Sequence, residues 1–359
     1  MAETMEFHRE VDPACEQGTR LLTICIPTHN RRLVLEECLE SVLPQADALG
    51  VGVCVSDNGS SDDTCQALET LKHQYPWMQI MRHTRDIGYR DNLIGAVLHS
   101  RAQYVWPIGD KLVLLPGALE FVVAELVRLH PDAVVVNSPR AIVSTIERIY
   151  SAPQSCLTDL GWWTTLCGAT VVPRQAWIDM LHVQPPSRDF PQVVALFCYL
   201  ASLSAPQVLF SGRVLIQSGK RAIETHQVSY SLAHPLEIWG RNWYDAIMNL
   251  PALYSVDDKL HVVRSFSQHE GILGLLGLLG LMRLRAQGEL TLQRLYADQV
   301  PLRAAVSAPW WSAVIISVVP RWMLRPVLYV QYVHPRQMLR AMRRRLRFRR
   351  GQQVHRSAP

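Results

Sequence analysis

Hydrophobic and polar residues form alternating blocks from residue 21 to residue 137, and the blocks predict a repeated order of strand and helix. Short apolar runs that end in polar loops predict buried strands at 21–26, 51–55, 78–82, 104–108 and 133–137. Apolar residues at helical spacing predict helices at 33–43, 92–99 and 116–129. A further helix is predicted to follow the polar residues 56–64 and to end at residue 71. This order is typical of an α/β domain with a largely parallel sheet, whose ligands bind at the carboxyl ends of the strands.

The alternation fades after residue 137. Residues 164–172 predict a return to the sheet, 192–203 predict a helix, and the pattern is mostly helical from about residue 220. No internal repeat is visible. The predicted parts are an N-terminal arm (1–20), an α/β domain (21–215), a helical extension with an interfacial segment (216–333) and a tail (334–359).

Two apolar stretches of the helical part raise the question of a membrane span. Residues 271–282 are apolar for only twelve positions, below the roughly 20 residues that cross a bilayer, so a buried helix fits them better. Residues 308–333 are longer, but Pro320, Arg321, Arg325 and Pro326 interrupt them while tryptophan and tyrosine recur. That mixture predicts a segment that lies in a membrane interface.

The net charge of +5 is unevenly distributed. Residues 334–359 hold nine arginines and no acidic residue, which leaves −4 (+5 less +9) for the other 333 residues. A nucleic-acid-binding body would carry its own basic face, so no nucleic-acid partner is expected. In the tail, Leu, Met and Phe are interspersed among the arginines, which favours binding to an anionic membrane surface; a solvated arm and an RNA-binding arm are the alternatives.

The composition indicates a globular protein with a substantial core. Apolar residues make up 48% and charged residues 19%, which excludes disordered, collagen-like and disulfide-scaffold classes. The eight cysteines include no CxxC pair, and reduced thiols are expected. The first twenty residues are acidic and lack an apolar block, unlike a secretory signal. We expect a cytoplasmic protein, peripheral at the inner face of the membrane.

Four polar clusters follow predicted strands, at 27–31, 56–63, 85–92 and 109–111. In a parallel sheet such loops line one crevice, so residues far apart in sequence can meet there. Together the clusters supply backbone amides, carboxylates and cations, the groups that hold a nucleotide diphosphate. Each cluster alone is also an ordinary turn or helix cap, and only their combination and order make the signal specific.

In this order, the motifs ICIPTHNR (24–31), VSDNGSSDDT (55–64), RDIG (85–88) with Asn92, and YVWPIGD (104–110) with LLPGA (114–118) resemble the family 2 glycosyltransferases. The similarity covers about residues 21–125. Within the family it is greatest to enzymes that add sugars to bacterial surface polysaccharides, including abequosyltransferase-like members. The resemblance implies a GT-A fold, a nucleotide-sugar donor, a glycan or lipid-linked acceptor, and direct displacement with inversion at the anomeric carbon.

The resemblance also implies roles for individual residues. Thr28 and its neighbours would contact the nucleotide, Asp57 the base or ribose, and Asp110 the ribose or diphosphate. A carboxylate such as Asp57 accepts hydrogen bonds from a base imide or from sugar hydroxyls. The donor-binding residues implied in this way are Pro27, Thr28, Asn30, Arg31, Asp57, Asn58, Arg85, Gly88, Asn92 and Asp110.

The chain departs from the family at Asp110-Lys111-Leu112. Family members carry two or three consecutive carboxylates there, which hold a divalent cation against the diphosphate. Lys111 weakens binding of Mg²⁺ or Mn²⁺, for which Asp110 would be a ligand if a metal is used. Either Lys111, with Arg85 or Arg90, neutralises the leaving diphosphate and acts in catalysis, or the protein is a non-catalytic relative that binds a nucleotide or glycan.

The resemblance further implies a general base after the strand at 167–172, and Asp189 is the candidate. Its alternative role is that of a stabilising carboxylate at a helix start beside Pro191. Trp162 and Trp163 are candidates for stacking on an acceptor sugar, and core packing is their alternative role.

Overall fold

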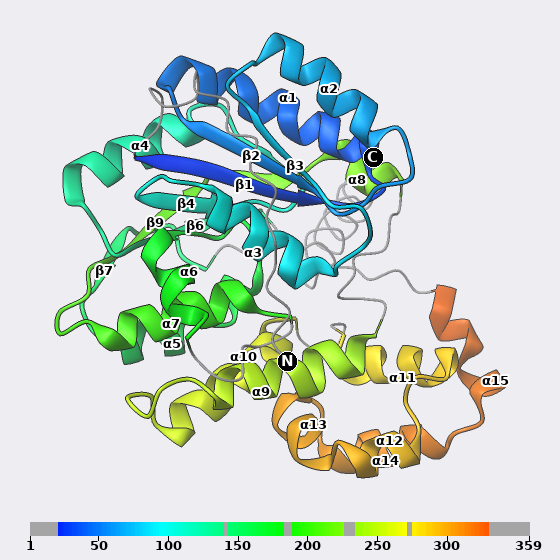
Figure 1. Ribbon diagram of the computed structural model, residues 1–359. Coiled ribbons are helices and arrows are strands. Elements are labelled where there is room, and N and C mark those ends of the chain that lie inside the picture. The colour runs from blue at the N-terminus through cyan, green and yellow to red at the C-terminus, as the bar shows by residue number, and fades with distance from the viewer. Residues whose placement is uncertain (1–20, 140–142, 183–188, 226–233, 271–274, 330–359) are drawn as a thin grey trace, which may run out of the picture. The chain divides into compact units, whose positions relative to one another are not determined.

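The computed structural model describes residues 21–139, 143–182, 189–225, 234–270 and 275–329, and the chain divides into two compact units (Figure 1). The first unit comprises residues 1–149, 167–182 and 207–226, and the second comprises 150–166, 183–206 and 227–359. Both units are therefore assembled from separate segments of the sequence. The predicted N-terminal arm and the arginine-rich tail lie outside the described residues.

A mostly parallel sheet of eight strands forms the centre of the first unit, in the order β3-β2-β1-β4-β8-β6-β9-β7. From β3 to β4 neighbouring strands are parallel, β8 is antiparallel to both β4 and β6, and β9 is parallel to β6. The strands are β1 (Leu22–Thr28), β2 (Gly52–Asp57), β3 (Gln79–Arg82), β4 (Tyr104–Pro107), β6 (Ala133–Asn137), β7 (Arg148–Tyr150), β8 (Thr170–Pro173) and β9 (Val208–Val214).

Strand β1 is completely buried along all seven of its residues. Its sequence LTICIPT is apolar on both faces because helices cover both sides of the sheet. In Figure 1, α1 (Arg32–Leu49), α2 (Thr64–Gln74) and α4 (Ala118–Leu129) lie above the strands, and α3 (Tyr89–His99) and α6 (Arg174–Met180) lie below.

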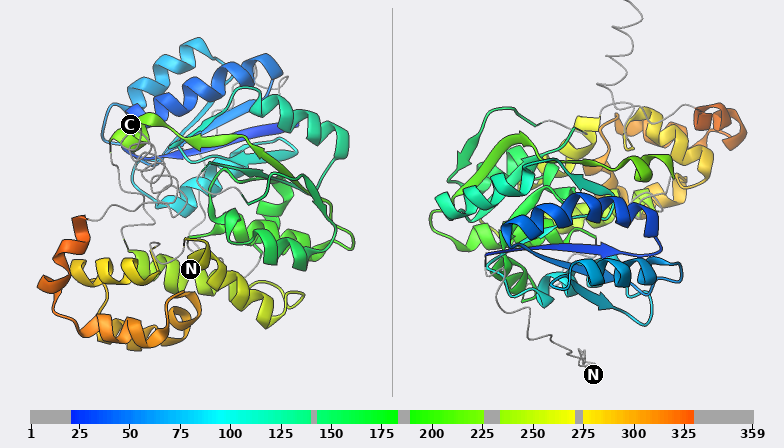
Figure 2. Two further views of the ribbon diagram at one scale, coloured as in Figure 1. Left: turned by 180° about the vertical axis from the view of Figure 1, so that it is seen from behind. Right: turned by 90° about the horizontal axis from the view of Figure 1, so that it is seen from above.

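A small antiparallel ladder joins β5 (Leu112–Leu114) to β10 (Ile216–Ser218), with Leu112 opposite Ser218. This pairing brings the segment that follows β9 next to the residues that follow β4. Figure 2 shows the same segment from behind, where it leads into α8 (Lys220–Glu224) beside α1.

The second unit is helical. Its core is aromatic: Trp239 stacks on Phe266 with ring centroids 3.9 Å apart, and the buried Tyr254 hydroxyl donates to the Phe197 carbonyl at 2.8 Å. Its elements are α5 (Pro153–Leu160), η2 (Trp163–Thr165), α7 (Pro191–Ser202), η4 (Glu237–Asn242), α9 (Trp243–Met248), α10 (Val256–Glu270), α11 (Leu278–Gln287), α12 (Leu292–Ala297), α13 (Gln299–Ala305), α14 (Trp310–Val318), α15 (Arg321–Leu324) and η6 (Arg325–Tyr329).

The predicted strands and helices between residues 21 and 137 are confirmed, as is the helical C-terminal part. The sequence pattern missed β5, β7 and β10 because three residues are too few to show a period of two. It also missed β9, which contains Gly212 at a φ of +66°. The strand predicted at 164–172 is shorter than expected and begins later, at Thr170 (β8). The short helix η2 (Trp163–Thr165) occupies the start of the predicted range.

The two apolar stretches form short helices where the structure describes them. Within 271–282, the described part starts α11, as predicted for a buried helix. Within 308–333, α14 ends at Val318, and α15 and η6 follow Pro320. No helix in the described ranges is long and apolar enough to cross a membrane.

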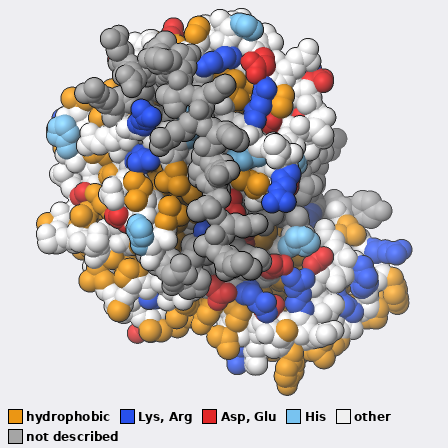
Figure 3. All heavy atoms as spheres, in the orientation of Figure 1, with side chains coloured by type: hydrophobic (Ala, Val, Ile, Leu, Met, Phe, Trp, Pro, Cys, Tyr) orange, Lys and Arg blue, Asp and Glu red, His pale blue; other side chains and the backbone are white. Residues whose placement is uncertain are grey.

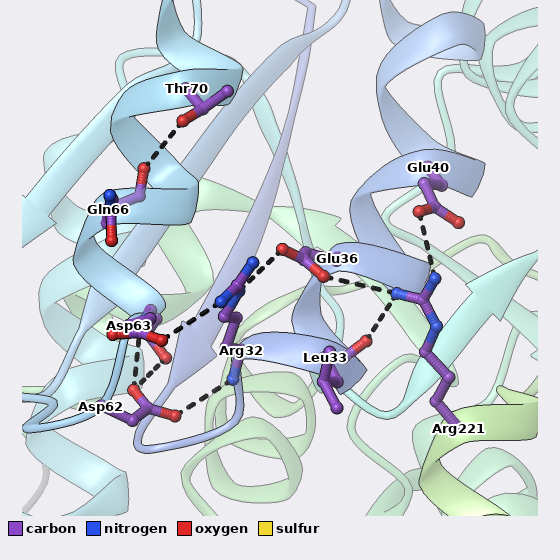
Figure 4. Close-up of polar contacts among 10 residues, drawn as sticks. Arg32, Leu33, Glu36, Glu40, Asp62, Asp63, Gln66, Thr70 and Arg221 are labelled. Atoms are coloured by element: carbon purple, nitrogen blue, oxygen red, sulfur yellow. Dashed lines mark hydrogen bonds and ion pairs between the residues drawn. The ribbon is translucent and has the colours of Figure 1, made fainter.

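Carboxylates of α1 hold the start of α8 (Figure 4). Arg221 donates to the Leu33 carbonyl at 3.1 Å and pairs with Glu36 and Glu40 at 3.5 Å. Glu37 accepts from the backbone N–H groups of Lys220 at 2.7 Å and of Arg221 at 2.8 Å. Since helix starts leave amides unsatisfied, the Glu37 carboxylate caps α8 from a distant part of the sequence.

We predict that Glu37→Ala lowers the free energy of unfolding by about 1 kcal/mol, as loss of a helix cap does. Glu40→Ala is the matched control: its carboxylate is 62% exposed and makes one contact with Arg221, so its effect stays below about 0.5 kcal/mol. Urea unfolding monitored by circular dichroism measures both. Equal effects of the two variants would contradict the capping role of Glu37.

Candidate functional site

Three strands of the first unit lead to polar residues at one edge of the sheet. Strand β1 lies between β2 and β4, parallel to both, and Thr28 is paired with Asp57 across the ends of β1 and β2. Asp110 follows β4, and Thr28 Oγ1 donates to Asp110 Oδ2 at 3.0 Å across 82 positions of sequence. The structure therefore brings these three predicted site residues to one place.

The Asp110 carboxylate is held on both of its oxygens. Thr28 donates to Oδ2, and Arg31 Nη1 donates to Oδ1 at 3.0 Å. The Asp110 side chain is only 5% exposed, and that of Arg31 is 23% exposed. A carboxylate this deeply buried requires an opposite charge and hydrogen bonds, and Arg31 and Thr28 provide them.

The Asp57 carboxylate organises the loop that follows β2. Its Oδ1 accepts from the backbone N–H of Ser60 at 3.2 Å and from the Ser60 hydroxyl, and its Oδ2 accepts from the Cys65 thiol at 2.9 Å. The hydrogen bond to Asp57 raises the pKa of the Cys65 thiol, which therefore stays a protonated donor at neutral pH. Asp57 is 1% exposed, and its predicted contact with the donor stays a prediction.

Asn58 joins three loops. Its backbone N–H donates to the Thr28 carbonyl at 2.9 Å, its Oδ1 accepts from Ile87 N–H at 2.9 Å, and its Nδ2 donates to Asp86. Asp86 also accepts from the N–H of Gly88 at 2.8 Å, which fixes the start of α3. The cluster at 85–92 is thereby tied to the ends of β1 and β2.

His29 and Asn30 complete the link between the first two loops. His29 Nδ1 donates to the Asn58 carbonyl at 2.8 Å, and Asn30 Nδ2 donates to His29 Nε2 at 3.1 Å. Asn30 has a φ of +51°, a conformation that Asn tolerates better than most residues. Its Oδ1 accepts from Ser61 N–H at 2.7 Å, which fixes the turn before α2.

Asn92 is buried between α3 and the sheet. Its Nδ2 donates to the Ser56 carbonyl at 3.1 Å, and its Oδ1 accepts from the Ser56 hydroxyl at 2.6 Å. The same hydroxyl lies 3.3 Å from His83 Nε2, and burial lowers the pKa of His83, so that this ring is neutral at pH 7. Asn92 positions α3 on β2, and its predicted contact with the donor stays a prediction.

Three further predicted residues lie at the edge of this network. Pro27 is buried in β1 opposite Ser56, and Arg85 is exposed in the loop after β3. Lys111 is half-buried, and its carbonyl accepts from Gly219 N–H at 2.8 Å. The residue beside Asp110 is thereby fixed to the segment between β10 and α8.

The remaining predicted site residues belong to the second unit. Asp189 is buried just before α7, and its carboxylate accepts from Asn242 Nδ2. Trp162 stacks on His269 with ring centroids 3.8 Å apart and meets Trp163 edge-on at 5.7 Å. Both tryptophans are buried, at 7% and 4% exposure, so their rings contribute to packing within this unit. Acceptor binding by these tryptophans stays a prediction.

Sequence reasoning did not assign roles to the residues that hold the predicted ones in place. Ser56, Ser60, Cys65 and Asp86 are of this kind. The spacing of Asp57 and Ser60 is typical of an Asx turn and was a usable signal. Cys65 gave no such signal, because no sequence pattern shows that its thiol contacts the Asp57 carboxylate in the folded protein.

Residues 23–164 match the model of glycosyl transferase family 2. This match covers less than half of the chain. All the donor-binding residues implied by the resemblance lie inside this segment, whereas Asp189 lies beyond it.

Two curated proteins align with part of the chain. Abequosyltransferase RfbV of Salmonella typhimurium is 32% identical over 101 residues, 28% of this chain and 30% of that protein. Chondroitin synthase of Escherichia coli is 29% identical over 123 residues, 33% of this chain and 18% of that protein. The alignments therefore span less than a third of either relative.

A solved structure shares the fold over most of its length. The structure of S. aureus TarS 1–349 in complex with UDP-GlcNAc has a TM-score of 0.56 and 13% identity, and the match covers 86% of this chain and 87% of that one. At this identity the likeness establishes the fold. The predicted GT-A fold, with its mostly parallel sheet and helical C-terminal part, is confirmed.

We predict that Gly59→Ala disrupts the loop that the Asp57 network holds. Gly59 has a φ of +67°, and a Cβ there would lie 2.7 Å from the Arg85 carbonyl carbon. The free energy of unfolding should fall by about 2 kcal/mol or more, from backbone strain and overlap together.

Gly50→Ala is the matched control, because Gly50 has a φ of +62° with nothing within 4 Å of an added Cβ. The Gly50→Ala variant should therefore lose only the free energy that backbone strain costs, about 1 kcal/mol. Denaturant unfolding of the two variants measures the difference. If the two variants lose the same free energy of unfolding, the inferred close approach of the Gly59 loop to the Arg85 backbone is wrong.

Proposed function

We propose that this chain is a glycosyltransferase that moves one sugar from a nucleotide-sugar donor to a lipid-linked glycan acceptor. The observation that supports the proposal is the meeting of Thr28, Arg31, Asp57 and Asp110 at one sheet edge, inside a domain of this family. These groups match the hydroxyls, base edge and diphosphate of a nucleotide-sugar.

We propose an inverting reaction. The acceptor hydroxyl oxygen attacks the anomeric carbon, the bond from that carbon to the diphosphate oxygen breaks, and a general base takes the hydroxyl proton. Asp189 is the proposed base, and its buried carboxylate accepts a hydrogen bond from the Asn242 amide. Lys111 is proposed to stabilise the negative charge of the leaving nucleoside diphosphate.

A second candidate function is a non-catalytic protein that binds a nucleotide or glycan on the same fold. The observation that favours it is Lys111 at a position where the family carries an acid. A binder raises the melting temperature with its ligand and does not consume it. An enzyme releases the nucleoside diphosphate, so the two functions are separable in one assay.

We predict transfer or hydrolysis with one member of a panel of UDP-, dTDP-, GDP- and CDP-sugars. Asp189→Asn should reduce turnover by about 100-fold or more, the usual contribution of a general base, with the donor-induced shift in melting temperature retained. Asp159→Asn is the control, since it changes another hydrogen-bonded carboxylate of the second unit. Turnover that survives in Asp189→Asn would remove this residue from the mechanism.

We also propose that the protein works at the inner face of the cytoplasmic membrane. The arginine-rich tail and the exposed apolar residues of α14 and α15 support this. Figure 3 shows hydrophobic and basic side chains side by side over these helices, at the lower right. The exposed residues, each more than half accessible, are Trp311, Ile315, Val318, Trp322 and Met323.

The charge of this region fits an anionic surface. From residue 299 to residue 359 the sequence contains twelve arginines and no acidic residue. Trp311, Ile315 and Val318 are spaced to lie on one face of α14. An apolar face flanked by arginines is typical of a helix that lies in a membrane interface.

We predict that the protein floats with vesicles of phosphatidylcholine and phosphatidylglycerol, less with phosphatidylcholine alone, and less at high salt. Ile315→Ser with Val318→Ser should weaken vesicle binding several-fold, because the two substitutions remove apolar side chains that would be buried in the membrane interface. The matched control is Ile146→Ser with Val127→Ser, at 74% and 57% exposure in the first unit. If the variant with Ile315→Ser and Val318→Ser floats as well as the unmodified chain, α14 is not the anchor and the arginine-rich tail is the remaining candidate.

A further inference from the structure

The residues after β4 do not form the acidic cluster that the family resemblance implies. Asp110 is followed by Lys111 and Leu112, and Leu112 is 4% exposed at the start of β5. A Cβ on Gly168 would lie 2.6 Å from Leu112 Cδ1, so this side chain packs in the core of the first unit. The third position of the family's acidic run thus has no access to a ligand.

The residues present do not fit a divalent cation. Asp110 is the only carboxylate of the three positions, and its two oxygens accept from Thr28 and Arg31, each at 3.0 Å. Mg²⁺ and Mn²⁺ require several oxygen ligands around one centre. In the described ranges, no group of three or more His, Cys, Asp and Glu side chains could hold a metal ion.

Arg31 places a permanent positive charge beside this carboxylate instead. A guanidinium does not lose its proton in proteins, and its fork of five N–H donors matches the oxygens of a phosphate. The contact with Asp110 uses Nη1, and the side chain is 23% exposed, so it is accessible from solvent. Arg31 also precedes α1, whose first turn contains no acidic residue and adds positive partial charge.

We propose that Arg31, oriented by Asp110, takes the charge-neutralising role that a divalent cation has elsewhere in the family, so that the donor diphosphate binds without metal. This inference rests on the proposed function, because it concerns the diphosphate of the same donor. Asp110 fixes the guanidinium, and the guanidinium donates to phosphate oxygens. Lys111, the next residue after Asp110 in sequence, adds a second cation.

The experiment is calorimetric titration of the full chain with UDP, dTDP, GDP and CDP, in EDTA and in Mn²⁺. We expect one diphosphate to bind equally well in both conditions. Arg31→Gln should weaken it by about tenfold or more, the effect of losing one charge-assisted contact. The corresponding nucleoside, which has no phosphate, should bind both proteins alike, a result that a merely structural ion pair does not predict.

Arg32→Gln is the matched control. Arg32 is the next residue, is 44% exposed, and pairs with Glu36 and Asp63 (Figure 4). Its replacement should change diphosphate affinity by less than about twofold, since exposed ion pairs contribute little. Arg31→Lys keeps the charge without the fork and should fall between Arg31→Gln and the unmodified chain.

Removing Arg31 alone leaves the buried Asp110 carboxylate without its cation and can prevent folding. Arg31→Gln combined with Asp110→Asn avoids this, and it should also bind the diphosphate weakly in both conditions. The Arg31 role is overturned if binding requires Mn²⁺, or if Arg31→Gln with a native fold binds as tightly as the unmodified chain. If none of the four diphosphates binds in either condition, the proposed function fails and this inference fails with it.

Discussion

The parallel pairing of β1 with β2 and β4 is the constraint on which the candidate site depends. All seven residues of β1 are buried, so its backbone groups must be satisfied by the two neighbouring strands. Because the three strands run in the same direction, their carboxyl ends come to one edge. Thr28, Asp57 and Asp110 meet there as a consequence of backbone hydrogen bonding, before any side-chain contact is considered.

Burial at this edge then decides the side-chain chemistry. Carboxylates that are almost fully excluded from water require donors, and each finds them within the first unit: Asp57 at Ser60 and Cys65, Asp110 at Thr28 and Arg31. The loops are consequently fixed by hydrogen bonds among themselves. A site organised in this way requires little rearrangement when a ligand arrives, which lowers the entropic cost of binding.

The second unit follows a different physical rule. Its core consists of stacked and edge-on aromatic rings such as Trp239 on Phe266, and short helices break at prolines. Such a core tolerates irregular helix packing because large rings fill irregular spaces. The last helices leave apolar side chains exposed within an acid-free stretch of sequence, and this combination distinguishes them from the rest of the unit.

The sequence by itself determined the α/β order of residues 21–137, the helical C-terminal part and the polar clusters of the site, because burial period and turn chemistry are local properties. It also determined that an acid is missing at Lys111. Only the tertiary structure decided that Arg31 pairs with Asp110, that Leu112 turns into the core, and that Glu37 caps α8. Those contacts join residues as many as 184 positions apart, and no local pattern encodes which buried charge meets which donor. The short strands β5 and β10 were decided in the same way, since their existence depends on each other.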